Sequence, residues 1–417
     1  MYRLTKFCRL CLNKEIKIAF KLSKIPLGEK YFLNKNKALK QKKFPQTIGW
    51  CPKCNNVQVM EVINNKLLWQ NYTYLSGQTE AIVKHFEKFT KKTLKRFNLN
   101  KNDLIIDIGS NDGSLLKAFK KSKKKIRVLG VEPAKNVAQL AEKKNINTLN
   151  KFFDFNLSKL INKKFKKAKI ITCFNTFAHS ENLRSIVKGI KNILDKDGVF
   201  IFECQYLMDI YKNKILGTFF HEHLYHHSVS SLKYFFNLYG MELFDVEKAN
   251  IQKGSIIGYV GFKKRFEIKK NVKNFIKKEN FRGNRNLKYL KKFEKFVRVK
   301  KEECKKILSN KKLNVTGFGS ARSGPTLAFN YGINDKIKAI FDDHPLKRNK
   351  FTGLNGLPVY PTKMINSFNN NVSVILAYLH SKKIIRKNLK YLKGGGKFLI
   401  IYPNPKLIHN KNYKKFI

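Results

Sequence analysis

The sequence has no apolar run long enough to cross a membrane. None of its stretches approaches the roughly 18 consecutive apolar residues that a membrane-spanning helix requires. Its first residues, MYRLTKFCRLC, are basic but lack the apolar segment and the small-residue cleavage site of a secretory signal. We therefore expect a soluble, cytoplasmic protein without a membrane partner. Its 417 residues, 42% of them apolar, are enough for two or three domains at about 100–200 residues each.

Acidic residues are scarce, because 28 Asp and Glu face 87 Lys and Arg and give a formal net charge of +59. Such a charge is typical of proteins that bind nucleic acid or anionic membranes. Here the lysines are spread over the whole length, in KQKKF, KKSKKK, NKKFKKAK and LKYLKKFEKF, and they form no single basic arm. We interpret the charge as a compositional bias and expect no specific nucleic-acid partner. A nucleic-acid-binding protein with a zinc knuckle remains a rival, which salt-dependent binding would reveal.

Only seven cysteines are present, and four of them form two CxxC pairs, Cys8 with Cys11 and Cys51 with Cys54. In an intracellular chain, paired CxxC motifs indicate metal binding before disulfide bonding. Structural zinc takes four thiolates in a tetrahedron, and each CxxC turn supplies two of them. The intervening segment, residues 12–50, is longer than the loop of the short zinc ribbons. We predict a structural zinc site, because four thiolates leave no open position for catalysis.

Short, apolar, β-branched segments alternate with amphipathic segments from about residue 103 onward. DLIIDIG, IRVLGVEP, AKIITCFN and GVFIFECQ read as buried strands, and NDGSLLKAFKK, AKNVAQLAEKK and LRSIVKGIKNIL read as the helices between them. After a Lys-rich helical stretch, KLNVTGFGS, KIKAIFDD, VSVILAYL and KFLIIYP resume the alternation. This order predicts an α/β protein with two mainly parallel, Rossmann-like sheets covered by helices.

The first strand and its following turn, LIIDIGSNDGSLLKAF, lack the GxGxxG fingerprint of dinucleotide-binding folds. Gly109 and Gly113 allow a tight turn and close approach of the backbone to a ligand. Glu132 ends the second strand, where an acidic residue accepts hydrogen bonds from ribose hydroxyls. This arrangement predicts S-adenosylmethionine as cofactor, with Asp107 and Glu132 placing negative charge near its sulfonium. The expected binding residues are Asp107, Gly109, Ser110, Asn111, Gly113, Glu132 and Asn175.

Two histidine-containing segments are candidates for the chemistry. FNTFAHSENL places Asn175 and His179 after a strand, at the edge of a sheet where α/β proteins bind ligands. FFHEHLYHHS then gathers four histidines and a glutamate into ten positions. These histidines either satisfy local hydrogen bonds, or bind a metal through His223 and His227 at helical i, i+4 spacing, or transfer protons. In the catalytic interpretation His223 is the base, and Glu222 orients it or carries a second proton.

These segments together resemble the sugar C-methyltransferases that act on nucleoside-diphosphate 4-keto-sugars. The resemblance extends over nearly the whole chain and includes the two CxxC pairs, NYTYLSG, DIGSNDGSLL, GVEPAKNVA, FNTFAHSENL, FECQYL, HEH, GFGSARSGPTLAFNYGI and DDHPLKRNKFTG. It implies a zinc-binding module over residues 1–70 and a methyltransferase domain with the HEH segment over 71–264. A helical connector over 265–310 and a C-terminal Rossmann-like sugar-nucleotide domain over 311–417 follow.

The resemblance also implies a reaction and its residues. A base removes a hydrogen next to the sugar ketone, and the resulting carbanion attacks the sulfonium methyl group. By resemblance the base is His223, with Glu222 beside it, while His179 and Tyr74 lie around the keto-sugar. The expected product carries a new methyl group on carbon, C3 being the expected position, and the expected substrate is dTDP-linked. The oligomeric state does not follow from the sequence.

The chain departs from the family pattern at two places. Phe220 stands where the family usually has a tyrosine two residues before the glutamate, so one phenol is missing. Arg322, Ser323 and Gly324 replace the usual Ala-Lys-Gly. Tyr225 or Tyr74 are candidates to replace the phenol. The alternative is a different substrate, in which case the protein is an O-methyltransferase or methylates another small molecule.

Overall fold

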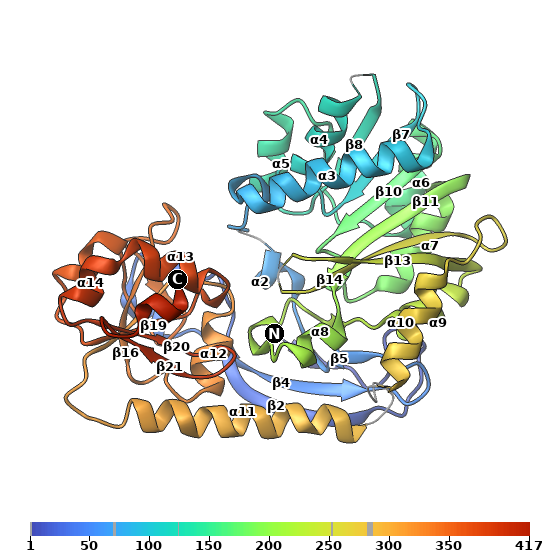
Figure 1. Ribbon diagram of the computed structural model, residues 1–417. Helices are drawn as coiled ribbons and strands as arrows, with labels where there is room; N and C mark the ends of the chain where they lie inside the picture. Colours follow the sequence, from blue (N-terminus) through green and yellow to red (C-terminus); the bar gives the residue numbers. More distant parts are fainter. Residues whose placement is uncertain (1, 70–71, 124, 252, 282–286) are drawn as a thin grey trace.

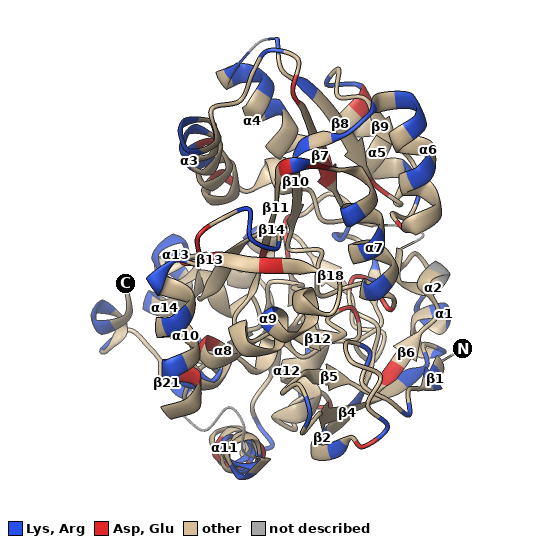
Figure 2. Ribbon diagram, turned by 90° about the vertical axis from the view of Figure 1, so that its right-hand side faces the viewer, with Lys and Arg blue, Asp and Glu red and all other residues tan. Residues whose placement is uncertain are grey.

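The computed structural model describes residues 2–69, 72–123, 125–251, 253–281 and 287–417. Within them the chain builds three main sheets, one of seven strands, one of six and one of four, together with two two-stranded sheets (Figure 1). Among the described helices, none is both long and apolar enough to cross a membrane. The Lys-rich composition is distributed over the helices of both α/β parts, with blue segments on α3, α4, α6, α7, α11 and α14 in Figure 2.

The seven-stranded sheet has the order β13-β14-β11-β10-β7-β8-β9, and the predicted parallel strands form its centre. Strands β7, β8, β9, β10 and β11 run parallel, whereas β14 is antiparallel to both β11 and β13. The sheet is therefore mixed rather than all parallel. Its strands are β7 (Leu104–Ile108), β8 (Arg127–Val131), β9 (Thr148–Leu149), β10 (Ala168–Phe174), β11 (Leu194–Gln205), β13 (Met241–Ala249) and β14 (Ser255–Phe262).

Helices cover both faces of this sheet because successive strand residues point to opposite sides. Ile105 packs in one cluster with residues of α3, α4 and α5, and its neighbour Ile106 packs in another with residues of α6, α7 and α9. The helices of this part are α3 (Glu80–Phe97), α4 (Ser114–Ser122), α5 (Lys135–Glu142), α6 (Phe155–Phe165), α7 (Leu183–Ile193), α8 (Leu207–Lys212) and α9 (Val229–Asn237).

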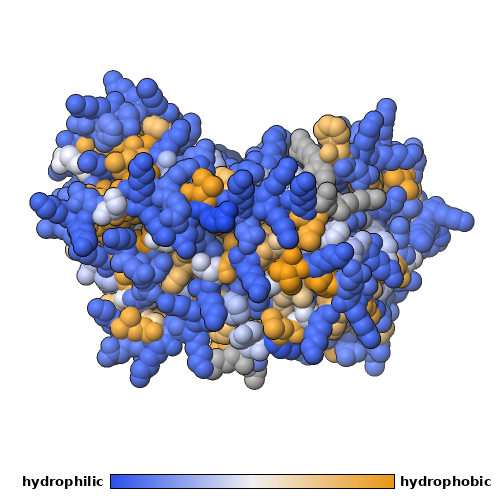
Figure 3. Space-filling view, turned by 90° about the horizontal axis from the view of Figure 1, so that it is seen from below, coloured by the Kyte–Doolittle hydropathy of each residue, from blue (hydrophilic) through white to orange (hydrophobic). Residues whose placement is uncertain are grey.

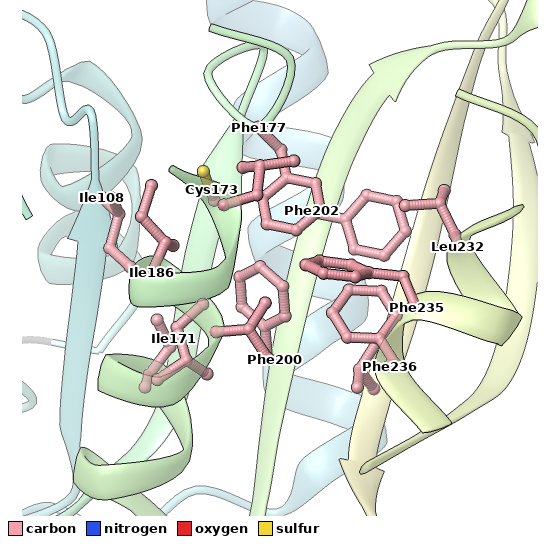
Figure 4. Packing of buried hydrophobic residues seen from close by; sticks show 14 of the residues in the cluster. Ile108, Ile171, Cys173, Phe177, Ile186, Phe200, Phe202, Leu232, Phe235 and Phe236 are labelled. Carbon is pink, nitrogen blue, oxygen red and sulfur yellow. The ribbon is translucent and has the colours of Figure 1, made fainter. Parts of the chain in front are cut away.

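A phenylalanine cluster fixes the loop that follows β10. Phe177 is fully buried and stacks on Phe236 at 5.8 Å and on Phe202 at 5.4 Å between ring centroids (Figure 4). Burial of an aromatic side chain of this size contributes about 2–3 kcal/mol. Because Phe177 lies midway between Asn175 and His179, this packing holds both polar side chains at the edge of the sheet.

The N-terminal part is a four-stranded antiparallel sheet with the order β12-β5-β4-β2. Its last strand, β12 (Tyr225–His226), comes from the HEH segment and pairs with β5. The zinc-ligand region and the histidine segment therefore share one sheet, although Tyr225 and its partner Gln58 are 225 − 58 = 167 positions apart in the sequence. The other elements are β1 (Tyr2–Leu4), β2 (Lys17–Pro26), β3 (Tyr31–Phe32), α1 (Lys35–Leu39), β4 (Lys43–Trp50), β5 (Val57–Val59), β6 (Glu61–Ile63) and α2 (Asn65–Trp69).

The C-terminal six-stranded sheet has the order β18-β16-β15-β19-β20-β21 and is parallel except for β21. Helices α10 (Lys270–Phe281) and α11 (Leu287–Ile307) precede it, and α11 runs along β2 at the bottom of Figure 1. The remaining elements are β15 (Val315–Phe318), α12 (Gly324–Asn330), β16 (Ile337–Phe341), β17 (Phe351–Thr352), β18 (Val359–Tyr360), β19 (Val372–Ile375), α13 (Ser381–Lys387), α14 (Leu389–Lys393), β20 (Lys397–Ile400) and β21 (Lys406–Ile408).

Seen from below, the molecular surface is mostly hydrophilic, with small apolar areas between long charged side chains (Figure 3). On this face the pattern agrees with lysines that act as a solvated surface, and in Figure 2 Lys and Arg lie on several separate helices.

Candidate active site and zinc centre

The two CxxC pairs fold into matching turns. In the first turn Leu12 N donates to Cys8 O at 2.8 Å, and in the second Asn55 N donates to Cys51 O at 2.9 Å. Leu12 and Asn55 both take positive φ values, 61° and 58°, which lets each turn close. The same sequence spacing thus produces the same backbone geometry twice.

The four cysteine sulfurs lie within 4.8 Å of one another, which suits a tetrahedral zinc ion. Two amide groups lie against them, with Asn56 Nδ2 at 3.5 Å from Cys8 Sγ and Asn13 Nδ2 at 3.8 Å from Cys51 Sγ. Such outer N–H donors favour thiolate ligands. The donor set therefore fits the predicted structural zinc, with all four positions supplied by Cys8, Cys11, Cys51 and Cys54.

The zinc-binding sheet also holds the HEH segment in place. Val59 N donates to Leu224 O at 3.1 Å, and the His221 ring bonds the carbonyl of Pro45 through Nε2 at 3.1 Å. Arg9 adds a contact from Nη1 to Leu224 O at 3.4 Å. The backbone around His223 is therefore anchored to the zinc module on one side.

The cofactor loop after β7 has the tight turn that its glycines predict. Gly109 has a φ of +73°, and a Cβ atom at this position would lie 2.3 Å from Thr176 Oγ1. Gly113 also has a φ of +73° and is the N-cap residue immediately before α4. Only glycine fits at position 109, because both the conformation and the space exclude a side chain.

Glu132 is the acidic end of β8 and faces this loop. Its Oε2 accepts from Asn111 N at 2.9 Å, and its Oε1 accepts from Ala134 N at 2.9 Å. Burial raises the pKa of Glu132 above its usual value, while the two backbone donors lower it. Each carboxylate oxygen keeps a second lone pair, so the group can accept from two ribose hydroxyls as well.

Asp107 has a different position from the one expected of a charge beside the sulfonium. It lies inside the sheet, where Oδ1 accepts from Thr172 Oγ1 at 2.6 Å, and it does not line the cavity described below. Burial raises its pKa to about 7. The position of Asp107 makes it a support for the turn, and of the two acidic residues expected beside the sulfonium only Glu132 lines the cavity.

A cavity of about 440 Å³ lies over the carboxyl ends of these strands. Of the residues expected to bind the cofactor, Gly109, Asn111, Glu132 and Asn175 line it, whereas Asp107, Ser110 and Gly113 support the turn from behind. Apolar and aromatic side chains complete the wall, including Trp69, Ile82, Phe86, Val131 and Phe153. Its size and its mixed lining suit a nucleoside cofactor.

Asn175 is positioned by a buried carboxylate. Its Nδ2 donates to Glu203 Oε1 at 3.0 Å, and the other oxygen of Glu203 contacts His85 Nε2 at 2.5 Å. Burial works to lower the pKa of His85, but the bond to Glu203 raises it above the usual value. No sequence motif indicated His85, because it reaches Glu203 only through the packing of α3 beside β11.

A second cavity of about 250 Å³ adjoins the first. The two share Tyr72, Tyr74, Asn175 and His179 as a common wall. His223 lines only the second cavity, together with side chains of the C-terminal part such as Arg322, Ser323 and Tyr378. The expected catalytic residues His223, His179 and Tyr74 are thus brought together, and the cavity lies where the large sheet and the C-terminal domain meet.

His223 has a defined tautomer. Its Nδ1 lies 2.8 Å from Thr218 O, and a carbonyl oxygen only accepts, so Nδ1 carries the hydrogen and Nε2 is free to act as a base. Burial lowers the pKa of His223 to about 4, which keeps the ring neutral near pH 7. Its faces lie against His179 at 5.1 Å and Phe220 at 4.0 Å.

Glu222 does not orient His223 in the way the sequence suggested, because the orienting bond comes from Thr218. Instead Glu222 Oε2 accepts from Arg322 Nη1 at 3.2 Å, and the same nitrogen donates to the hydroxyl of Tyr72 at 3.1 Å. Burial raises the pKa of Glu222, and Arg322 acts against this shift. The side chain of Glu222 is 6% exposed, so this ion pair is internal.

The metal interpretation of the histidine segment required a helix, and the segment is not helical. Residues 221–222 form a turn and Tyr225–His226 form a strand, so His223 and His227 do not share a helix face. His227 Nε2 instead lies 3.4 Å from Phe177 O. Among the described residues, the only group of three or more ligand atoms placed for a metal is the cysteine cluster.

Three family models match successive parts of the chain. They are a putative zinc binding domain over residues 8–69, a methyltransferase domain over 82–246 and a C-methyltransferase C-terminal domain over 250–403. The chain is also similar to C-methyltransferase NovU from Streptomyces niveus, with 25% identity over 407 residues that cover 96% of each protein. These matches agree with the resemblance inferred from the sequence motifs.

Solved structures with a similar fold cover less of the chain. An S-adenosylmethionine-dependent methyltransferase from Clostridium acetobutylicum matches 43% of this chain and 92% of its own, at 15% identity and a TM-score of 0.34. Magnesium protoporphyrin IX methyltransferase from Synechocystis, with bound SAH, matches 46% and 89%, at 16% identity and a TM-score of 0.34.

Proposed function

We propose, for a chain that belongs to the zinc-containing, S-adenosylmethionine-dependent C-methyltransferases, that its substrate is a nucleoside-diphosphate 4-keto-deoxysugar. The methyl group goes to a carbon next to the ketone, with C3 as the proposed position and dTDP as the proposed nucleotide. The observation that carries the proposal is the pair of adjoining cavities, one suited to the cofactor and the other containing a neutral, oriented imidazole.

His223 is proposed to start the reaction. A hydrogen on a carbon next to a ketone is acidic because the resulting enolate places its charge on oxygen. Nε2 of His223 takes this hydrogen as a proton, and the electron pair of the C–H bond forms the enolate. The residues of the first cavity would hold S-adenosylmethionine, which would supply an electrophilic methyl group to the enolate carbon and leave as S-adenosylhomocysteine.

The residues between the cavities are proposed to align the two reactants. His179 stacks on His223 and lies parallel to Trp69 at 5.3 Å, so its ring is held on both sides. Burial lowers the pKa of His179 well below its usual value, so it remains uncharged. His179 and Tyr74 thus form part of the wall between the two cavities, where the sugar ring can lie.

The C-terminal part is proposed to hold the rest of the nucleotide sugar. Arg322, Ser323, Tyr378 and Leu379 reach the second cavity from this part of the chain. A sugar placed beside His223 therefore has its nucleotide directed toward the C-terminal sheet, where Rossmann-like folds bind ligands.

Phe220 supports a second candidate, O-methylation of a related substrate. Its ring contacts His223 directly and offers no hydroxyl to an enolate. O-methylation needs the base only to take a proton from a hydroxyl group, and no carbon-bound hydrogen is removed.

Product analysis separates the two candidates. The protein is incubated with cofactor labelled by ¹³C in its methyl group and with a set of dTDP-4-keto-deoxysugars, and the product is examined by NMR. The proposal expects a labelled methyl group bonded to carbon next to the ketone. A methyl group bonded to oxygen supports the second candidate, and an absence of label from every sugar contradicts both.

A further inference from the structure

The enolate oxygen needs a hydrogen-bond donor, and two of the hydroxyl groups around the second cavity already donate to other partners. Thr218 Oγ1 donates to Gln205 Oε1, and the hydroxyl of Tyr225 donates to Glu181 O at 3.2 Å. Burial raises the pKa of Tyr74, and a hydrogen bond that Thr79 donates to the phenol oxygen lowers it, so this bond does not use the hydrogen of Tyr74. Phe220 has no hydroxyl at all, so a donor must come from another residue.

Tyr72 lines this cavity and the cofactor cavity, and it differs from the other phenols of the second cavity in accepting a hydrogen bond from a buried guanidinium group. Its oxygen accepts from Arg322 Nη1 at 3.1 Å, and the guanidinium group lies 4.7 Å from the centroid of its ring. Within the described part of the chain, no bond uses the hydrogen of this hydroxyl. Burial raises the pKa of Tyr72 to about 12, so the group keeps its proton near neutral pH.

Contacts place Tyr72 and His223 around the same space. Along one side the rings follow one another from Tyr72 to Trp69 at 5.5 Å, to His179 at 5.3 Å and to His223 at 5.1 Å. Along the other side Arg322 joins the Tyr72 hydroxyl to Glu222, the residue next to His223. The two series of contacts close a ring around the cavity, with a base at one point and a phenol at another.

Arg322 makes this phenol a better donor than an isolated tyrosine. A positively charged group that donates to the phenol oxygen withdraws electron density from its O–H bond. Glu222 balances the charge of Arg322, so the pair remains stable when buried. As negative charge develops on the enolate oxygen, the Tyr72 hydrogen bond becomes stronger, which lowers the barrier.

We infer that Tyr72 donates the hydrogen bond that stabilises the ketone oxygen as it becomes an enolate, and that Arg322 is the positioning residue that holds Tyr72 in place. This inference rests on the proposed C-methylation. It also explains how the site functions with Phe220, since the donor comes from a tyrosine that lies 148 positions earlier in the sequence and is fixed by a residue of the C-terminal part.

Tyr72→Phe tests the inference, with Tyr211→Phe as the control. Tyr211 is a buried tyrosine in α8 whose hydroxyl has no partner among the described residues, so its loss removes a hydroxyl elsewhere. Loss of one donor to an oxyanion lowers kcat by about 10²–10³-fold in other enzymes. We expect such a fall for Tyr72→Phe, with a parallel fall in solvent-deuterium exchange of the substrate and with affinity for S-adenosylhomocysteine within about threefold of the wild type.

A double-mutant cycle tests the positioning role of Arg322. If Arg322 acts through Tyr72, Arg322→Gln lowers kcat in the wild type but adds less than about threefold in the Tyr72→Phe background. Fully additive losses overturn this role, and a kcat of Tyr72→Phe within threefold of the wild type overturns the inference itself. Failure of the proposed function is distinct, because the wild-type protein then shows neither methylation nor exchange with any keto-sugar.

Discussion

Glu132→Gln should weaken cofactor binding more than its small change in shape suggests. The carboxylate of Glu132 already accepts from two backbone N–H groups, those of Asn111 and Ala134. An amide can satisfy one of these donors with its oxygen, but its NH₂ group then faces the other N–H. The substitution therefore removes one accepted bond beside the cofactor loop and a charged acceptor for the ribose.

The expected size follows from these bonds. A hydrogen bond to a charged group contributes about 1.5–3 kcal/mol, and a buried donor left without a partner costs about 1–3 kcal/mol. Part of this loss lowers the free energy of unfolding, because the bond from Asn111 exists without the cofactor. The loss of the ribose contacts lowers the free energy of cofactor binding. We expect affinity for S-adenosylhomocysteine to decrease by about 10- to 100-fold, which corresponds to roughly 1.4–2.7 kcal/mol.

Isothermal titration calorimetry with S-adenosylhomocysteine measures this change, and thermal unfolding measures the share that falls on stability. Glu142→Gln is the matched control, because Glu142 is exposed on α5 and its substitution removes the same charge. An affinity of Glu132→Gln within threefold of the wild type, with an unchanged Tm, would refute the assignment of Glu132 to the cofactor.

Three further changes probe the zinc centre, the base and the cofactor loop. Removal of zinc by a chelator should lower kcat at least tenfold, because Val59 and Pro45 of the zinc module hold the HEH segment, while S-adenosylhomocysteine binding should change less. An equal loss of kcat in the activity assay and of affinity in calorimetry would contradict this coupling. The low pKa of His223, about 4, keeps the base neutral, so kcat/KM should lack a titration near pH 6.5 and fall only toward pH 4. As the pH falls from about 6.5 to 4, the unfolded state binds a proton before the folded state does, so Tm should decrease over this range. A constant Tm would count against a buried neutral ring. Gly109→Ala should destabilise the fold by about 2 kcal/mol or more and abolish cofactor binding, as measured by thermal unfolding and calorimetry. The control Gly395→Ala lies at a φ of +89° with nothing within 4 Å of an added Cβ, so it should show only the backbone cost of about 1–2 kcal/mol. Equal effects of the two substitutions would contradict the steric argument.

Features that depend on neighbouring residues were predictable from the sequence. The two CxxC turns, the glycine turn after β7 and Glu132 at the end of β8 all follow from spacing within a few residues. The α/β fold class, the methyltransferase activity and both cofactors are confirmed by the matching family models. Short-range patterns suffice here because each one defines a complete local geometry.

Features that depend on contacts between distant segments were not predictable. The sequence indicated Asp107 as a cofactor ligand, but its side chain accepts a hydrogen bond from Thr172 of the neighbouring strand and lies within the sheet. The bond that orients His223 is made to a backbone carbonyl, and every residue type has one, so the sequence gives no signal for it. The pairing of β12 with the zinc module and the contact of Arg322 with Tyr72 likewise depend on how the parts of the chain pack together.

The spacing of His223 and His227 also shows why a pattern needs its secondary structure. On a helix an i, i+4 pair lies one turn apart on the same face, whereas an extended segment separates the two residues by roughly 13 Å. This segment instead joins a strand of the zinc-binding sheet, and the pairing with β5 decides its conformation. The two rings consequently make unrelated contacts, one in the second cavity and the other with the carbonyl of Phe177.

Hydrogen exchange at the substrate carbon tests the central claim most directly, because it detects deprotonation without methyl transfer. A dTDP-4-keto-deoxysugar is incubated in deuterated water with the protein and S-adenosylhomocysteine, and incorporation is followed by NMR. The wild-type protein should exchange the hydrogen next to the ketone, and His223→Gln should do so at least 100-fold more slowly, while His409→Gln should match the wild type. Equal exchange rates in His223→Gln and the wild type would show that another group removes this hydrogen.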